Sequence, residues 1–106
     1  MKDPVNEIVR GTTPPIIYTL PFPVDVIEVG FIVVKQGQIV VIERSLSECI
    51  CEGNTVTAKL TQEETLALES NCNAEIRLVV KTYDGNRLET VDSVLAVSDT
   101  HKDEVI

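Results

Sequence analysis

The chain has 106 residues, the length of a single domain; 43% of them are hydrophobic and only 4% are aromatic. Because it has no Trp, its interior must be built mostly from Ile, Val and Leu, and branched aliphatic residues favour strands. The net charge of −8 argues against nucleic acid or an anionic membrane as a partner, since both attract clustered Lys and Arg. No run approaches the roughly 18 apolar residues of a spanning helix, and no signal peptide is recognisable, so we expect the protein to stay in the compartment where it is made.

The first ten residues indicate an N-terminal arm, and residues 11–15 (GTTPP) separate it from a predicted strand at 16–20. Pro21 and Pro23 have no backbone N–H to donate to a neighbouring strand, so 21–23 should cross between strands. We expect Phe22 to close one end of the core.

The two strongest predicted strands lie at 26–35 and 38–44. Gln36 and Gly37 separate them by the two residues of a tight hairpin, in which Gly37 supplies a positive φ. Gly30, inside the first of these strands, predicts a bulge or a close neighbour.

Both strands of this hairpin are apolar on both faces, whereas a solvent-facing side is normally polar. We assign to the core the alternate residues Ile27, Val29, Phe31 and Val33. The residues left on the outer side form our predicted protein interface: Val26, Ile32, Val34, Val40 and Ile42. The competing interpretation is that isolated valines are tolerated on the surface of a sheet.

A short strand is predicted around 49–51, and Gly53 with Asn54 turns the chain into a strand at 55–60 with Val56, Ala58 and Leu60 inward. The Thr61 hydroxyl can then accept from the Glu64 N–H while the Glu64 carboxylate accepts from the Thr61 N–H. This capping box predicts a helical connector that ends near 70–71.

A second hairpin is predicted from 74–83 and 87–97, with the turn at Asp84 and Gly85. In its first strand, alternation places on the core side Ala74, Ile76, Leu78 and Val80. About seven strands and one short helical connector predict an all-β fold, an immunoglobulin-like antiparallel β-sandwich. The Cys and Trp pattern of antibody domains is absent, so a small open barrel is the alternative. The expected organisation is an arm at 1–10, a β-sandwich domain at 11–98 and a C-terminal tail at 99–106.

Residues that could carry catalysis have simpler explanations. His101 lies in the predicted tail, Glu63 and Glu64 open the helical connector, and Asp84 belongs to a turn. Cys49, Cys51 and Cys72 are an odd set with spacing unsuited to a disulfide or zinc site, and fit free thiols. We therefore predict no enzyme activity, no cofactor and no metal.

Four short segments carry a family resemblance: 8–14 (IVRGTTP), 35–37 (KQG), 60–65 (LTQEET) and 83–87 (YDGNR). They resemble short structural proteins of phages and prophages of Gram-positive bacteria. Those proteins are similar to the N-terminal immunoglobulin-like domain of upper-baseplate (BppU-like) proteins of siphophage tails. The likeness spans residues 8 to about 106. The receptor-binding or fibre region of a full upper-baseplate protein does not follow, so a direct receptor role is not expected.

The resemblance implies a non-catalytic virion module, associated with the tail or baseplate, which oligomerises and docks. Its partners would be further copies or other phage structural proteins, without nucleic acid, membrane or small-molecule substrate. It would reside in the virion, and in the host cytoplasm before assembly. Under this reading Arg10, Gly11 and Thr12 lead into the first strand, and the residues at 61, 64, 84 and 85 only cap and turn the chain.

The competing hypothesis is a binding or regulatory module of the same mobile element. It would capture a host protein through an exposed strand edge.

Overall fold

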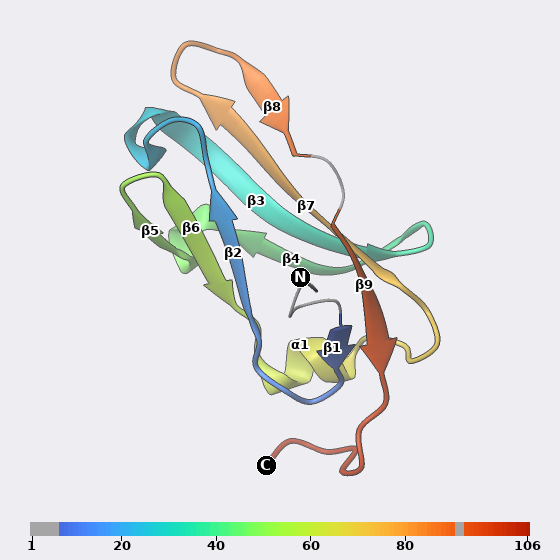
Figure 1. Ribbon diagram of the computed structural model, residues 1–106. Helices are drawn as coiled ribbons and strands as arrows, with labels where there is room; N and C mark the ends of the chain where they lie inside the picture. Colours follow the sequence, from blue (N-terminus) through green and yellow to red (C-terminus); the bar gives the residue numbers. More distant parts are fainter. Residues whose placement is uncertain (1–6, 91–92) are drawn as a thin grey trace, which may run out of the picture.

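The structure is a computed structural model that describes residues 7–90 and 93–106, and it is mostly β (Figure 1). Within those residues nine strands form two sheets. The large sheet has the order β1 (Glu7–Val9), β9 (Ser93–Ser98), β7 (Ala74–Thr82), β3 (Ile27–Gln36) and β4 (Ile39–Ser45), with β8 (Arg87–Glu89) also paired to β7. The small sheet has the order β2 (Pro15–Thr19), β6 (Thr55–Lys59) and β5 (Ile50–Glu52). The predicted all-β class is confirmed.

Three short helical elements join these strands. They are the 3₁₀ turns η1 (Val24–Val26) and η2 (Leu46–Glu48) and the helix α1 (Gln62–Leu66). β1 runs parallel to β9, and the other strand pairs are antiparallel.

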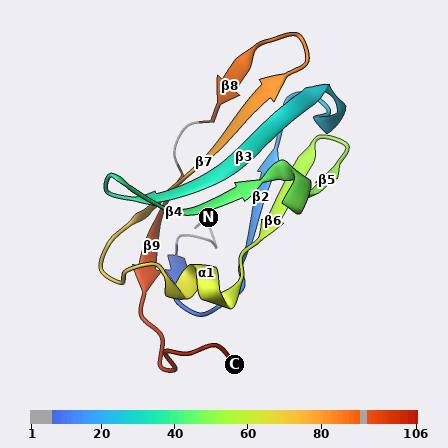
Figure 2. The same ribbon diagram turned by 180° about the vertical axis from the view of Figure 1, so that it is seen from behind.

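One aliphatic core lies between the two sheets, which face each other in both views (Figures 1 and 2). β7 contributes Ile76, Leu78 and Val80, and β6 contributes Val56 and Ala58, all of them buried. Both predicted alternations are therefore confirmed. Phe22 packs against the core from the chain between β2 and η1, as expected.

The predicted orientation of β3 is wrong for most of its length. Ile32 and Val34, expected outside, are fully buried, as is Ile42 of β4 at 3% exposure. Val29, expected inside, is 42% exposed. Ile27, as predicted, packs against the core.

A one-residue bulge explains this reversal. Ile27 pairs with Thr82 of β7 and Val29 pairs with the next residue, Lys81, so Glu28 is an extra residue in β3. Because side chains alternate along a strand, an extra residue moves all those after it to the opposite face. Strict alternation counted from Ile27 therefore assigns the wrong face from Val29 onward.

Gly30 has the close neighbours that the sequence predicts. It lies on the inner face opposite Val80, and a Cβ there would approach Cδ1 of Leu46 to 2.6 Å and Cγ1 of Val80 to 3.0 Å. Leu46 of η2 thus occupies space that only a glycine in β3 leaves open.

The local signals are confirmed with small shifts. Gly37 has φ +64°, but Gln36 pairs with Ile39, so the two turn residues are Gly37 and Gln38. The capping box is present: the Thr61 hydroxyl accepts from the Glu64 N–H at 3.1 Å, and Glu64 Oε1 accepts from the Thr61 N–H at 2.9 Å. The helix ends at residue 66, earlier than expected.

Two segments differ more from expectation. The predicted arm contains β1, which joins the edge of the large sheet beside β9; its residues 1–6 lie outside the described residues. The returning strand of the second hairpin is two strands, β8 and β9, each paired to β7. Among the described residues, no helix has the length and apolar character needed to cross a membrane.

The orientation of β3 can be tested with two truncations. Ile32→Ala removes a fully buried side chain and should lower the free energy of unfolding by about 2–5 kcal/mol, because it leaves a cavity. Val29→Ala on the opposite face should cost less than about 1 kcal/mol. Urea unfolding followed by circular dichroism measures both. A larger loss at Val29 than at Ile32 would contradict the orientation.

Candidate functional site

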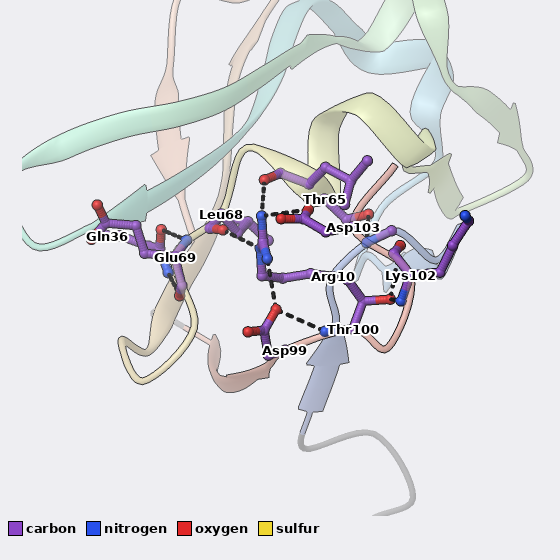
Figure 3. Close-up of polar contacts among 11 residues, drawn as sticks. Arg10, Gln36, Thr65, Leu68, Glu69, Asp99, Thr100, Lys102 and Asp103 are labelled. Atoms are coloured by element: carbon purple, nitrogen blue, oxygen red, sulfur yellow. Dashed lines mark hydrogen bonds and ion pairs between the residues drawn. The ribbon is translucent and has the colours of Figure 1, made fainter. Parts of the chain in front are cut away.

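Arg10, directly after β1, is the centre of a polar cluster that joins three distant segments (Figure 3). Its Nε donates to the carbonyl of Leu68 and its Nη2 donates to the carbonyl of Leu66, both at 2.8 Å. Its Nη1 donates to Asp99 at 2.7 Å, and Nη2 also lies 3.3 Å from Asp103. We call this cluster the Arg10 junction.

The junction supplies hydrogen-bond donors to carbonyls at and just after the end of α1, where the helix has no internal donors left. The backbone beside Arg10 is held as well, since the Gly11 N–H donates to the Thr65 hydroxyl at 2.9 Å and that hydroxyl donates to the Thr12 carbonyl at 2.8 Å. Asp99 raises the already high pKa of Arg10, chiefly by its hydrogen bond. Every nitrogen of the guanidinium already has a partner, so the role of the junction is to hold these segments together.

The segment that follows β9 is docked in this structure. Besides Asp99, the backbone of Ile106 is held by Gln62, whose Nε2 donates to the Ile106 carbonyl at 2.9 Å and whose Oε1 accepts from the Ile106 N–H at 2.8 Å. His101, in the same segment, is exposed.

A second polar anchor holds the chain after α1. Gln36 is only 8% exposed, and its Nε2 donates to the carbonyls of Glu69 and Cys72 at 2.9 and 3.2 Å. Its Oε1 accepts from the Glu69 N–H at 2.8 Å. The inward-facing side-chain amide of Gln36 thus makes hydrogen bonds to this one loop through both its nitrogen and its oxygen.

The carboxylates considered for acid–base chemistry are occupied in local structure. Asp84 lines a hollow of about 540 Å³ together with Phe22 and Leu88, but it accepts from the Thr82 hydroxyl and the Asn86 N–H. The Thr82 hydrogen bond is the main cause of its lowered pKa, which makes it a weak base. Glu64 accepts from Arg44 as well as from the Thr61 N–H.

The three cysteines are free thiols. Burial raises the pKa of Cys49, with a smaller contribution from Cys51, and burial also raises the pKa of Cys51. A raised pKa disfavours the reactive thiolate. Within residues 7–90 and 93–106, no three His, Cys, Asp or Glu side chains lie together as metal ligands would.

The feature that resembles a functional surface is the side of β3, β4, β7 and β8 that points away from the small sheet. We call it the outer face. Four apolar side chains form its centre: Val29, Phe31, Val33 and Val79. Val29 is 42% exposed and the other three are partly exposed. Phe31 and Val79 are direct cross-strand neighbours, so the centre is continuous.

Charged side chains surround this centre. The strand register places most of them beside it, and an ion pair of 3.8 Å with Lys81 places Glu28 there. They are Glu28, Lys35, Glu43, Glu75, Arg77, Lys81, Arg87 and Glu89. An apolar centre with a charged rim is the usual arrangement of a protein–protein interface.

Part of this rim is already ordered. Glu89 is paired with Arg77 at 3.1 Å and with Arg87 at 3.0 Å, and the hydrogen bond from Arg77 is the main cause of its lowered pKa. A hollow of about 220 Å³ lies next to these charges, lined by Val33, Lys35, Glu75, Arg77, Val79 and Glu89. The outer face is therefore shaped and charged without being a closed pocket.

The predicted interface residues are divided by the fold. Val40 is 50% exposed and pairs with Lys35 on the outer face, and Val26 is 39% exposed in η1. The other three, Ile32, Val34 and Ile42, lie in the core and cannot contact a partner. The sequence indicates that both faces of the hairpin are apolar, but the faces were assigned wrongly because the bulge follows from the pairing with β7 and leaves no signal within 26–35.

The scan against protein-family models and the searches of curated proteins and of solved structures found no match to this chain.

The stabilising role of the Arg10 junction can be tested by mutation. Arg10→Met should lower the free energy of unfolding by about 2 kcal/mol or more, because it leaves two partly buried carbonyls without a charged donor. Lys59→Met is the control, since its side chain is exposed on β6 away from the outer face, and it should cost about 0.5 kcal/mol or less. Equal losses in chemical denaturation would refute the role.

The pH dependence of the junction follows from Asp99. The hydrogen bond from Arg10 lowers the pKa of Asp99 in the folded state, so its contribution is present at neutral pH and is lost as the pH falls through that lowered value. We expect the wild type to lose stability as the pH falls below about 4, and Asp99→Asn to lose less over the same range. Thermal unfolding at several pH values measures this, with Asp25→Asn as the control. Parallel curves for wild type and Asp99→Asn would contradict it.

Proposed function

We propose that this chain is a non-catalytic structural module of a phage or prophage particle, associated with the tail or baseplate, that acts by docking to other protein chains. The single observation that carries the docking role is the outer face, where an apolar centre is surrounded by charged side chains on four adjacent strands. The phage context comes from the motif resemblance described above.

We also propose that the fold is an immunoglobulin-like sandwich. In such domains strands B, E and D form one sheet, and G, F, C and C′ form the other. If strands are lettered along the chain with β1 as A and with β8 left out, β2-β6-β5 corresponds to the first order and β9-β7-β3-β4 to the second. β1 extends the second sheet at its G edge. The topology supports this assignment over the small open barrel, because no strand of one sheet pairs with a strand of the other among the described residues.

The resembling motifs have structural tasks in this fold. Arg10 and Gly11 belong to the junction, and Gly37 turns the first hairpin. Thr61 and Glu64 cap α1, and Gly85, with φ +91°, turns the second hairpin. Motifs that build the framework in this way fit a family whose members share a scaffold.

Association with particles can be tested in the bacterial strain that encodes the chain. Particles induced from that strain and purified should contain the protein, and mass spectrometry would detect it. Cross-linking of those particles with a lysine-reactive reagent should link Lys35 and Lys81, on the outer face, to a neighbouring chain more often than Lys59 and Lys102.

Absence from purified particles would overturn the proposal. Recovery outside the particles, bound to one identified host protein through a strand edge, would favour the alternative of a regulatory module.

A further inference from the structure

We propose that the outer face binds the same face of a second copy of this chain, giving a two-fold homodimer. This inference rests on the proposed docking function and names its partner. A two-fold contact requires a surface that is complementary to itself. The distribution of charge identifies the outer face as such a surface.

Among the described residues, the outer face is neutral although the protein is strongly acidic. It has four basic residues (Lys35, Arg77, Lys81 and Arg87) and four acidic residues (Glu28, Glu43, Glu75 and Glu89). Outside it, the described residues include four basic ones (Arg10, Arg44, Lys59 and Lys102) and 11 acidic ones. The acidic ones are Glu7, Asp25, Glu48, Glu52, Glu63, Glu64, Glu69, Asp84, Asp99, Asp103 and Glu104.

Two copies of such a protein repel each other over most of their surfaces. Approach through the outer faces avoids this repulsion, because neither face has a net charge. A different partner that recognised this protein through charge would be basic, and would be drawn to the acidic remainder of the surface. The neutral face with an apolar centre therefore fits a second copy best.

The arrangement of the charges is also self-complementary. Along β7 the outward residues are Glu75, Arg77, Val79 and Lys81, and along β3 they are Val29, Phe31, Val33 and Lys35. A two-fold axis that runs along the strands between β3 and β7 places Glu75 of one copy opposite Lys35 of the other. An axis that runs across the strands through the apolar centre places Glu75 opposite Lys81. Each axis pairs unlike charges at the rim and stacks apolar side chains at the centre.

The test uses charge reversal in the complete chain. Glu75→Lys gives the face a net charge of about +2, and Lys35→Glu gives it about −2. Each variant alone should therefore raise the dissociation constant of the dimer at least about tenfold. An equimolar mixture should form a heterodimer with an affinity near that of the wild-type dimer, because the two faces then attract. Sedimentation velocity across a concentration series measures all three.

Two further variants control for effects on folding. Glu75 and Lys35 are neighbours within one sheet, so each single reversal places like charges side by side. The double variant Glu75→Lys with Lys35→Glu restores this pair and the neutrality of the face, and it should dimerise. Glu52→Lys, an exposed reversal on β5, makes the same change in net charge and should leave the dimer unchanged.

A wild type that stays monomeric up to about 1 mM overturns the inference. So does a mixture of the two reversed variants that fails to associate, or a Glu52→Lys variant that dissociates as much as Glu75→Lys. The proposed function fails separately: a dimer that is absent from particles leaves this inference standing, whereas a strict monomer that cross-links to another particle protein through Lys35 refutes only the dimer.

Discussion

The bulge at Glu28 is the constraint on which both sides of the large sheet depend. β3 pairs with β7 on one edge and with β4 on the other. The set of alternate β3 residues that points inward therefore determines which residues of all three strands face the small sheet. The extra residue lets Ile27 and Gly30 both point inward, with Leu46 filling the space beside Gly30. The same shift leaves Val29, Phe31 and Val33 outside. One unpaired residue thus creates the core and the candidate docking surface together.

Turns, caps and regular alternation could be predicted from the sequence because each depends on residues close together in the chain. Gly37, the Thr61–Glu64 capping box and the buried positions of β7 belong to this class. Which residues of β3 face inward could not be predicted in this way, because that depends on which residue of β7 lies opposite each residue of β3. β1 is held by β9, some 90 positions away, so its short segment carries no local strand signal. The candidate surface was misplaced for the same reason.

The polar contacts of Arg10 and Gln36 hold chain segments together at one end of the domain. Arg10 joins the first strand to the end of α1 and to the segment after β9, while Gln36 holds the loop that leads into β7 (Figure 3). These side chains have their hydrogen-bonding groups used internally. The outer face, by contrast, keeps its apolar centre and most of its charges accessible, so framework and recognition occupy different parts of the molecule.

The uneven distribution of charge also bears on how far association can proceed. Sheets have edge strands, which among the described residues are β1, β4 and β8 in the large sheet and β2 and β5 in the small sheet. Such edges can template open-ended fibres. Two neutral outer faces can bind each other and give a dimer whose remaining surface is strongly acidic. The net negative charge of that remaining surface repels a third molecule, which favours an assembly of finite size. Acid or concentrated salt weakens this protection, since both reduce the repulsion that limits growth.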